Sequence, residues 1–292
     1  MKAVGAAVEP AAKCAVESAV ERAAKPVVLS GNSRVVSSGQ TGPHADLGRV
    51  LRRHFEHPFR QPVGDAARVA WASLRACWNG VMPLVFDSGC GVGDSTRRLA
   101  LMHPDALVVG VDQSADRLSR QRPEPLPANA MLLRADLVDF WRLAVADGVQ
   151  LTHHYLLYPN PWPKIGHLKR RWHGHPVFPS LLALGGRIEL RTNWATYAEE
   201  FAQALVVAQA AGGSPKSGNS GDNSGCNSGG NSGFELTFKA GHESGAAPGR
   251  FFWKLCTDTV SVAELLDPLT PFERKYAASG QTLHRVVAEP YA

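Results

Sequence analysis

The sequence predicts an α/β fold built around a parallel β-sheet. Short apolar runs alternate with longer segments in which apolar residues recur at helical spacing, and the alternation continues through five such strands. A strand–helix–strand order of this kind requires a parallel sheet joined by right-handed crossovers. Polar or glycine-rich stretches follow several of the apolar runs directly. In open α/β sheets the carboxyl ends of the strands are where ligands bind, so these stretches are the candidate functional segments.

The domain is expected to occupy residues 46–292. Residues 1–45 are rich in alanine and then in turn-forming residues, so we expect a disordered or frayed N-terminal tail. Residues 46–79 carry several arginines and then an apolar stripe at helical spacing. The first part of this segment is interpreted either as a basic arm or as the solvated face of a packed helix. Residues 212–233 are rich in glycine, serine and asparagine, which predicts a flexible insert within the domain.

The first α/β unit carries a glycine-rich turn. Residues 84–86 are an apolar strand, and the sequence DSGCGVGDS follows at once. Its glycines allow the backbone to turn sharply and to approach a ligand at a helix N-terminus. The helix that follows is expected to be capped by Asp94 or Ser95. The GxGxG spacing differs from the GxGxxG of dinucleotide-binding proteins, and a purely structural turn is the alternative. The three glycines are Gly89, Gly91 and Gly93.

Acidic residues follow the next two strands. The strand over residues 106–111 stops at Asp112, about 20 residues after the glycine turn, where a carboxylate can accept hydrogen bonds from both hydroxyls of a ribose. The alternative is that Asp112 caps the helix over residues 114–120. The strand over residues 130–133 is followed by Asp136, which either contacts the adenine of a nucleoside cofactor or caps the next helix.

The fourth strand, residues 153–158, leads into the sequence PNPWPKIGHLKRR. Its three prolines exclude a helix and a continued strand, so we expect the backbone to be extended and stiff. An amide, a flat indole and a cluster of cations follow one another. Such a set can hydrogen-bond a nucleobase, stack on it and hold its phosphates. The alternative is a proline-rich surface loop with a solvated basic run. The residues concerned are Asn160, Trp162, Lys164, Lys169, Arg170 and Arg171.

A fifth strand and a late segment complete the pattern. Residues 187–191 are expected to form the fifth strand, which is closed by the sequence Thr-Asn-Trp. Trp162 and Trp194 are each interpreted either as a wall of the core or as a base-stacking platform. Two more strands are predicted after the glycine-rich insert, at residues 234–238 and 283–287.

The composition favours an anionic partner and offers no metal or membrane signal. The net charge is +5 and the isoelectric point is near 9.0, which concerns steering toward a partner rather than the fold. The five cysteines are scattered and lack the CxxC or histidine-rich spacing of metal ligands, so we expect no metal. No apolar run approaches the ~18 residues that span a membrane. We therefore expect a cytoplasmic protein in a reducing compartment.

Taken together, the motifs resemble those of the single-chain bacterial tRNA (guanine-N7)-methyltransferases. The resemblance covers about residues 84–201 and resumes at TPFERKYAASGQ, and its specific parts are PxPWPKxxHxKRR, the TNW after the fifth strand and the late TxFE. It implies a Rossmann-like class I methyltransferase fold, with a mostly parallel seven-stranded sheet and helices on both faces. It also implies S-adenosylmethionine (SAM) as methyl donor. The implied acceptor is N7 of a guanine at position 46 of the tRNA variable loop, in a protein expected to act as a monomer.

The same resemblance implies roles for individual residues. Cofactor contacts are implied for the acids that follow the first three strands, for the glycine turn and for the loop asparagine. Contacts to tRNA are implied for the basic loop, the TNW turn and the TxFE segment. The expected cofactor set is Asp87, Gly89, Gly91, Gly93, Asp112, Asp136 and Asn160. The expected substrate set is Trp162, Lys164, Lys169, Arg170, Arg171, Asn193, Thr270 and Glu273.

Two positions depart from the family pattern, which usually has aspartate in PDPW and in TDW. Asn160 and Asn193 stand there, so neither side chain can act as a base or as a carboxylate clamp on a guanine. Guanine N7 carries an in-plane lone pair and no proton, so attack on a sulfonium methyl needs no deprotonation. We therefore expect Asn160, as the catalytic residue, to position the acceptor, with proximity supplying ~7–11 kcal/mol.

Two further functions remain open at this point. One is an RNA-binding protein of the same fold that has lost turnover through the two asparagines. The other is a methyltransferase that acts on another RNA or on a small molecule, although the adjacent cations beside Trp162 disfavour a small acceptor. The glycine spacing disfavours a NAD-linked dehydrogenase.

Overall fold

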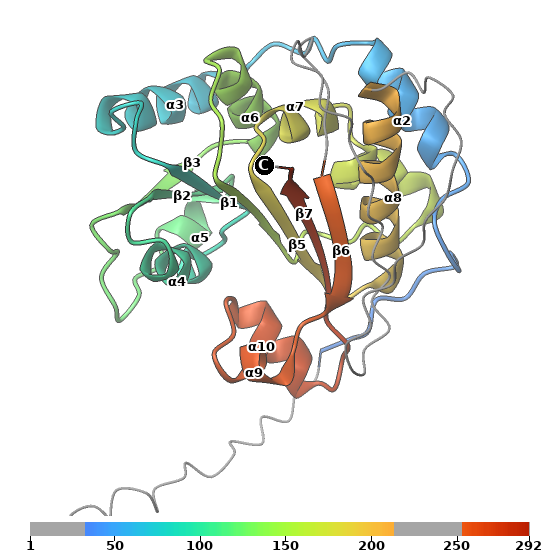
Figure 1. Ribbon diagram of the computed structural model, residues 1–292. Coiled ribbons are helices and arrows are strands. Elements are labelled where there is room, and N and C mark those ends of the chain that lie inside the picture. The colour runs from blue at the N-terminus through green and yellow to red at the C-terminus, as the bar shows by residue number, and fades with distance from the viewer. Residues whose placement is uncertain (1–32, 213–252, 292) are drawn as a thin grey trace, which may run out of the picture. The chain divides into compact units, whose positions relative to one another are not determined.

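A twisted seven-stranded sheet forms the centre of the computed structural model, which describes residues 33–212 and 253–291 (Figure 1). The strands are β1 Leu84–Ser88, β2 Leu107–Asp112, β3 Ala130–Arg134, β4 His153–Leu157, β5 Arg187–Thr192, β6 Trp253–Thr259 and β7 His284–Pro290. They lie in the order β3-β2-β1-β4-β5-β7-β6. β1 to β5 are parallel, and β7 runs antiparallel to both β5 and β6. The predicted mostly parallel seven-stranded sheet is confirmed.

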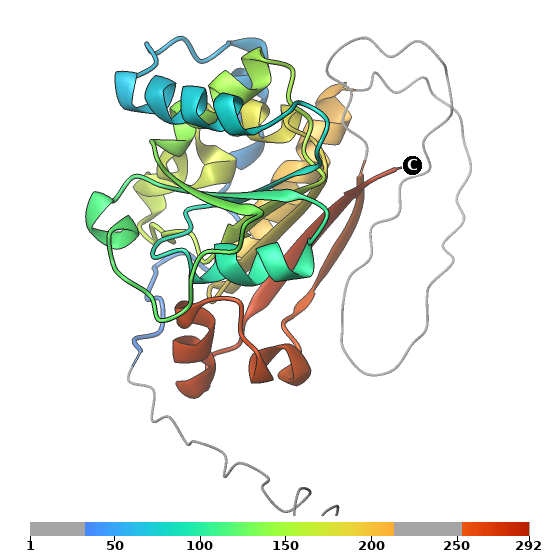
Figure 2. The same ribbon diagram turned by 90° about the vertical axis from the view of Figure 1, so that its left-hand side faces the viewer.

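Helices cover both faces of this sheet (Figures 1 and 2). The α-helices are α2 Leu47–Glu56, α3 Asp65–Cys77, α4 Asp94–Met102, α5 Ala115–Leu118, α6 Leu137–Ala146, α7 Phe178–Ala183, α8 Ala195–Gly212, α9 Val262–Leu266 and α10 Pro271–Ala278. Two short 3₁₀ helices follow β4, namely η1 Ile165–Arg170 and η2 Trp172–Gly174. The larger core lies between the sheet and α2, α3, α6, α7 and α8, and a smaller core lies under α4.

The strand residues divide between these two cores by strict alternation. In β1, Leu84 and Phe86 belong to the larger core, whereas Val85 belongs to the smaller one. This follows because successive side chains of a strand point to opposite faces of the sheet. All three side chains are at most 1% exposed. Burial of side chains of this size stabilises the fold by about 1.5–3 kcal/mol each.

The arginine-rich segment near the N-terminus is a packed helix and not an arm. α2 buries Leu47, Val50 and Leu51 in the larger core, while Arg52 and Arg53 on the same helix are exposed. The apolar residues recur at a spacing of three and four, which places them on one helical face. The interpretation as a solvated face over a core stripe is therefore confirmed.

Residues 33–45, which the sequence assigned to the tail, are attached to the domain. The Ser38 hydroxyl donates a hydrogen bond to the Pro163 carbonyl at 2.6 Å, and Gln40 Nε2 donates to Glu200 Oε1 at 2.5 Å. The folded part therefore begins before the predicted boundary at Asp46. The insert expected at 212–233 lies outside the described residues except for Gly212 at the end of α8, and so does the strand expected at 234–238.

The segment between β6 and β7 lies at the carboxyl edge of the parallel strands. The first residue of β7, His284, pairs with Thr192 at the end of β5 and with Thr259 at the end of β6. α9 and α10 connect these two strand ends, so they lie beside the edge from which the predicted site segments leave the sheet (Figure 1).

Candidate active site

The predicted site residues converge on this carboxyl edge of the sheet. β1 lies between β2 and β4, and the strand order runs away in opposite directions from the β1–β4 pair. In open α/β sheets, ligands bind outside the carboxyl ends of the strands at such a switch point. The glycine turn leaves β1 there, and the loop with Asn160 leaves the neighbouring strand β4.

The glycine turn is glycine-rich for conformational and for steric reasons. Gly89, Gly91 and Gly93 have φ values of 87°, 61° and 79°, in the left-handed region that a Cβ disfavours. A Cβ on Gly93 would also come within 2.8 Å of Leu132, so this glycine is required by packing. A Cβ on Gly89 or Gly91 would meet no atom within 4 Å. The first two glycines therefore border open space just before the N-terminus of α4.

Asp87, near the end of β1, is buried and holds the first turn of α4. Its Oδ2 accepts hydrogen bonds of 2.6 Å from the hydroxyls of both Ser95 and Thr96. Burial raises the pKa of Asp87 to about 6, and the two hydroxyl donors limit that rise. The predicted helix cap is wrong, because the N-cap of α4 is Gly93 and no side chain caps the helix. Ser95 instead points its hydroxyl at Asp87, which the strand pattern could not reveal.

Asp112 ends β2 with both carboxylate oxygens engaged by backbone donors. Oδ2 accepts from the Gly91 N–H at 3.0 Å, and Oδ1 accepts from the Ser114 N–H at 2.8 Å. The N-cap of α5 is Ser114, whose hydroxyl accepts from the Arg117 N–H, so Asp112 is not the helix cap. An ionised carboxylate offers about four acceptor positions, so each oxygen can accept a further hydrogen bond.

Asp136 and Asn193 follow β3 and β5 at the same edge. Asp136 caps α6, because its Oδ1 accepts from the Val138 N–H at 2.8 Å. One of its two predicted roles is thereby confirmed, and the contact with adenine stays a prediction. Asn193 is half-buried and donates from Nδ2 to Gln281 Oε1 at 2.9 Å.

The loop after β4 has a strained backbone on both sides of Asn160. Tyr158 and Trp162 have φ values of 52° and 46°, a left-handed conformation that costs about 1–2 kcal/mol for a residue with a Cβ. Strain of this kind persists where surrounding contacts impose it, and it gathers at functional sites. Asn160 is exposed and its Oδ1 accepts from the Trp162 N–H at 3.3 Å. The loop therefore presents the Asn160 amide at the surface in an imposed conformation.

Three of the predicted cations lie exposed beside this loop. They are Lys164, Lys169 and Arg170. The guanidinium carbon of Arg170 lies 4.8 Å from the centroid of the Trp162 ring, a cation–π contact. His167, which was not in the predicted set although it stands in the same motif, lies edge-on to that ring at 5.6 Å. Arg170 thus covers one face of the indole, and that face is not available to a stacked base.

Arg171 is a correction to the predicted substrate set. Its side chain is fully buried, and Nη1 donates to the equally buried Glu200 at 2.5 Å. Its guanidinium carbon lies 4.8 Å from the ring centroid of Trp194, which is itself 8% exposed. Arg171 therefore cannot meet a phosphate at the surface, and Trp194 is a wall of the core and not a stacking platform. A fourth cation in a basic run looks the same in sequence whether it points outward or inward.

Glu200 is the centre of the cluster that receives Arg171. Burial alone would raise the pKa of Glu200, but hydrogen bonds from His173 and Arg171 outweigh it and hold the pKa at about 2. His173 is also buried, and burial lowers its pKa. We therefore assign one charge pair, Arg171 with Glu200, and a neutral His173 that donates from Nε2 at 2.8 Å.

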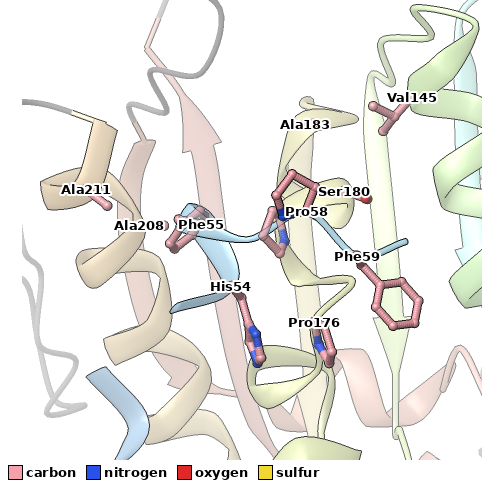
Figure 3. Close-up of a pocket in the computed structure, with 11 residues that line it drawn as sticks. His54, Phe55, Pro58, Phe59, Val145, Pro176, Ser180, Ala183, Ala208 and Ala211 are labelled. Atoms are coloured by element: carbon pink, nitrogen blue, oxygen red, sulfur yellow. The ribbon is translucent and has the colours of Figure 1, made fainter. Parts of the chain in front are cut away.

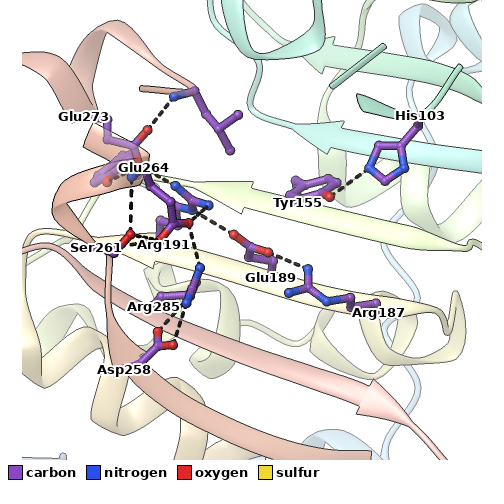
Figure 4. A network of polar contacts seen from close by, with 12 residues as sticks. His103, Tyr155, Arg187, Glu189, Arg191, Asp258, Ser261, Glu264, Glu273 and Arg285 are labelled. Carbon is purple, nitrogen blue, oxygen red and sulfur yellow. Dashed lines mark hydrogen bonds and ion pairs between the residues drawn. The ribbon is translucent and has the colours of Figure 1, made fainter. Parts of the chain in front are cut away.

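Thr270 and Glu273 are a second correction, since both are buried in the protein interior, as Figure 4 shows for Glu273. Thr270 is the N-cap of α10 and accepts from the Glu273 N–H at 3.0 Å. Glu273 is fully buried and accepts from the Tyr158 hydroxyl at 2.9 Å and from Arg191 Nη1 at 2.8 Å. The TxFE segment thus holds the start of the Asn160 loop from within, and direct contact with a substrate is not available to Glu273.

A hollow of about 490 Å³ lies elsewhere, among α2, α6, α7 and α8 (Figure 3). Phe55, Phe59 and Pro176 contribute to a mostly apolar lining. None of the predicted site residues borders this hollow. We therefore place the candidate site at the sheet edge, where the strand ends and the exposed polar groups coincide.

Within residues 33–212 and 253–291, no group of three or more metal-ligating side chains gathers as a metal site. In the same part of the chain, no helix combines the length and the hydropathy needed to cross a membrane.

Comparisons with known proteins locate relatives of this chain. A family model described as "Putative methyltransferase" matches residues 82–212. A tRNA (guanine-N(7)-)-methyltransferase of Thiobacillus denitrificans is 31% identical over 181 residues, which are 60% of this chain and 73% of that protein. Proteins of the same name from Bordetella parapertussis and a Nocardioides species are 31% and 33% identical, over 48% and 46% of this chain. This chain spans 55% and 56% of those two relatives.

Proposed function

The chain belongs to the tRNA (guanine-N(7)-)-methyltransferase family, and on this premise we propose that it transfers a methyl group from SAM to N7 of a guanine in tRNA. One observation carries the proposal: the glycine turn and the Asn160 loop leave the neighbouring strands β1 and β4 at the switch point of the sheet. A methyl donor at the first and a base at the second would lie side by side. The acceptor we propose is guanine 46 of the variable loop.

The residues at the glycine turn fit a nucleoside cofactor. Gly89 and Gly91 border open space, since a Cβ on either would meet no atom within 4 Å, and Asp112 keeps acceptor capacity for two ribose hydroxyls. Asp136 stands at the next strand end, where we propose that it lies near the adenine. When bound, SAM supplies an electrophilic methyl group on a sulfonium. We assign Asp87 to holding the turn that receives the cofactor, because its Oδ2 is occupied by Ser95 and Thr96.

The protein's part in the reaction is to align the acceptor. Guanine N7 presents a lone pair without a proton, so no general base is required. We propose that the exposed amide of Asn160 orients the guanine by donating or accepting hydrogen bonds, from a loop fixed by its strained ends. We propose that the Trp162 face opposite Arg170 stacks on a base, and Asn193 lies at the neighbouring strand end. Alignment of this kind can supply ~7–11 kcal/mol of the barrier.

The tRNA backbone is proposed to lie along the exposed cations Lys164, Lys169 and Arg170. Such contacts position the nucleic acid without reading its sequence. We further propose a cytoplasmic monomer whose domain is interrupted by the glycine-rich insert. In support of a reducing compartment, Cys77 and Cys90 are free thiols.

The two asparagines support one competing function, an RNA-binding protein of the same fold with impaired turnover. Neither Asn160 nor Asn193 can place a negative charge near the cationic purine that methylation creates. The Asn193 Nδ2 group already donates a hydrogen bond to Gln281. The competing function predicts tRNA binding without methyl transfer.

A single experiment separates the two. The purified chain is incubated with an unmodified tRNA transcript and labelled SAM, and modified nucleosides are mapped by mass spectrometry. We expect N7-methylguanosine at one position in the variable loop. Asn160→Ala should lower turnover at least tenfold by loss of alignment, whereas Asn160→Asp should keep or raise it, because a carboxylate can stabilise the cationic product. Binding of tRNA with no methyl transfer by the unaltered chain would favour the competing function.

A further inference from the structure

We propose that Arg171 and the N-terminal strap, defined as residues 33–44, position the loop that carries Asn160. Arg171 is then a positioning residue that acts from the interior. The strap becomes part of the active site although it lies more than a hundred residues away in sequence. This inference rests on the proposed methyl transfer, and it deepens it by naming what sets the acceptor geometry.

The loop can be held only through its carbonyl groups over much of its length. Pro159, Pro161 and Pro163 have no N–H to donate, so the usual backbone donors are missing at alternate positions. Three consecutive carbonyls, those of residues 162–164, each accept a hydrogen bond from a side chain outside the loop. Arg171 Nη2 donates to the carbonyls of Trp162 and Lys164, and the Ser38 hydroxyl donates to that of Pro163.

Arg171 contacts the loop from the protein interior, and its guanidinium N–H groups donate to two loop carbonyls. Its Nη2 lies 3.1 Å from the Trp162 carbonyl oxygen and 3.4 Å from that of Lys164, and its Nε lies 3.3 Å from the former. A guanidinium is planar and carries five N–H donors in set directions. One buried group therefore fixes both ends of the segment that follows Asn160.

The guanidinium is itself fixed by partners from three other elements. Glu200 of α8 accepts from Nη1 at 2.5 Å, and Gln40 Oε1 accepts from Nη2 at 3.0 Å. The guanidinium carbon lies over the Trp194 ring, 4.8 Å from its centroid. Because charge and donors are satisfied together in a buried place, Arg171 has little freedom to shift.

Residues of the strap hydrogen-bond both to Glu200, the partner of Arg171, and to the loop itself. Gln40 Nε2 and the His44 N–H both donate to Glu200 Oε1, at 2.5 and 2.9 Å. Ser38 donates its hydroxyl to the Pro163 carbonyl at 2.6 Å. At its start, Ser33 accepts through its carbonyl from Gln281 Nε2, and Gln281 in turn accepts from Asn193. The strap thus links both asparagine positions of the candidate site.

Adjacent serines provide a matched pair of variants. Ser38→Ala removes one hydroxyl donor to the loop and leaves no buried charge unpaired. Ser37→Ala removes an exposed hydroxyl from the next residue of the same strap. Arg171→Lys keeps a positive charge for Glu200, but an ammonium cannot donate to both loop carbonyls and stack on Trp194 at once.

Two readouts are measured on the full-length chain. The first is amide hydrogen exchange of peptides that cover residues 158–171, which needs no activity. The second is methyl transfer to a tRNA transcript, with SAM affinity measured by calorimetry. We expect faster exchange and a kcat about fivefold lower for Ser38→Ala, and a kcat about 10- to 100-fold lower for Arg171→Lys. SAM affinity should fall much less than kcat, because the glycine turn and Asp112, which carry most of the proposed cofactor contacts, are not held by Arg171 or by the strap.

The outcomes separate the inference from the function on which it rests. If Ser38→Ala matches Ser37→Ala in both readouts, the proposal that the strap positions the Asn160 loop is wrong, even when the unaltered chain methylates tRNA. If Arg171→Lys loses SAM affinity in proportion to kcat, Arg171 has only a general structural role. If the unaltered chain is inactive while Ser38→Ala increases hydrogen exchange in the loop, the proposed methyl transfer is wrong. The proposal that the strap positions the loop is then still supported.

Discussion

The carboxyl group of Asp87 shows how burial changes the behaviour of a single residue at this site. It is 1% exposed, and burial raises its pKa to about 6 from an ordinary value near 4. A carboxyl whose pKa is higher in the folded than in the unfolded state binds its proton more tightly when folded. Stability is therefore lost as the pH rises through this window, from about 4 to about 6.

We predict that this loss disappears in Asp87→Asn. A neutral amide oxygen can still accept from Ser95 and Thr96, and no proton has to leave. The free energy of unfolding of Asp87→Asn relative to the unaltered chain should rise by about 2 kcal/mol between pH 4 and pH 7. Urea denaturation at both pH values measures it, with the exposed Asp105→Asn as control. Parallel pH profiles for Asp87→Asn and the unaltered chain would contradict the assignment.

At the scale of one element, the short helix η1 determines which cations of the basic run are exposed and which is buried. Lys169 and Arg170 lie on its last turn and are exposed, whereas Arg171 directly after it points into the core. Neutralising an exposed phosphate contact reduces the salt dependence of RNA binding, by roughly 0.7–0.9 in the logarithmic slope per contact. The element therefore predicts how steeply binding depends on salt.

We predict that Lys169→Gln with Arg170→Gln lowers this slope by roughly 1.4–1.8, because two counterion-releasing contacts are lost. Fluorescence anisotropy of labelled tRNA across a series of salt concentrations measures the slope. Arg68→Gln on α3 removes one exposed charge outside the loop and should leave the slope unchanged. A slope that stays the same in the double variant would place the RNA elsewhere.

The elements themselves were predictable from local patterns, and their long-range contacts were not. The alternation of apolar runs and helical stripes predicts β1 to β5, because each pattern is confined to a few residues. The loop after β4 was recognised from prolines and cations that stand next to each other. No pattern links Gln40 to Glu200, since one lies in a turn-rich stretch and the other on an ordinary helix. Polar residues that serve the interior, such as Arg171 and Glu273, carry the same letters as surface ones.

Across the whole molecule, one polar network with a buried centre and partly exposed outer members joins the C-terminal strands and helices to the site (Figure 4). Arg191 of β5 lies at its centre and pairs with Glu189 at 2.8 Å, with Glu273 at 2.8 Å and with Glu264 at 2.9 Å. Arg285 of β7 extends the network by pairing with Glu264 as well. Through the Tyr158 hydroxyl, Glu273 connects this network to the start of the Asn160 loop. The late segment of the chain therefore supports the start of the Asn160 loop through Glu273.

We predict that Arg191→Met destabilises the protein by about 3–5 kcal/mol, because it leaves the buried Glu273 without its counter-charge and leaves Glu189 with Arg187 alone. Arg187→Met is the matched control on the same strand. Arg187 also pairs with Glu189 but is 28% exposed, so its loss should cost ~1 kcal/mol or less. Urea denaturation measures both, and exchange of peptides over the Asn160 loop should rise only in Arg191→Met. Equal losses of stability in the two variants would mean that burial does not set the strength of this network. Unchanged exchange of the loop peptides in Arg191→Met would mean that Glu273 does not hold the loop.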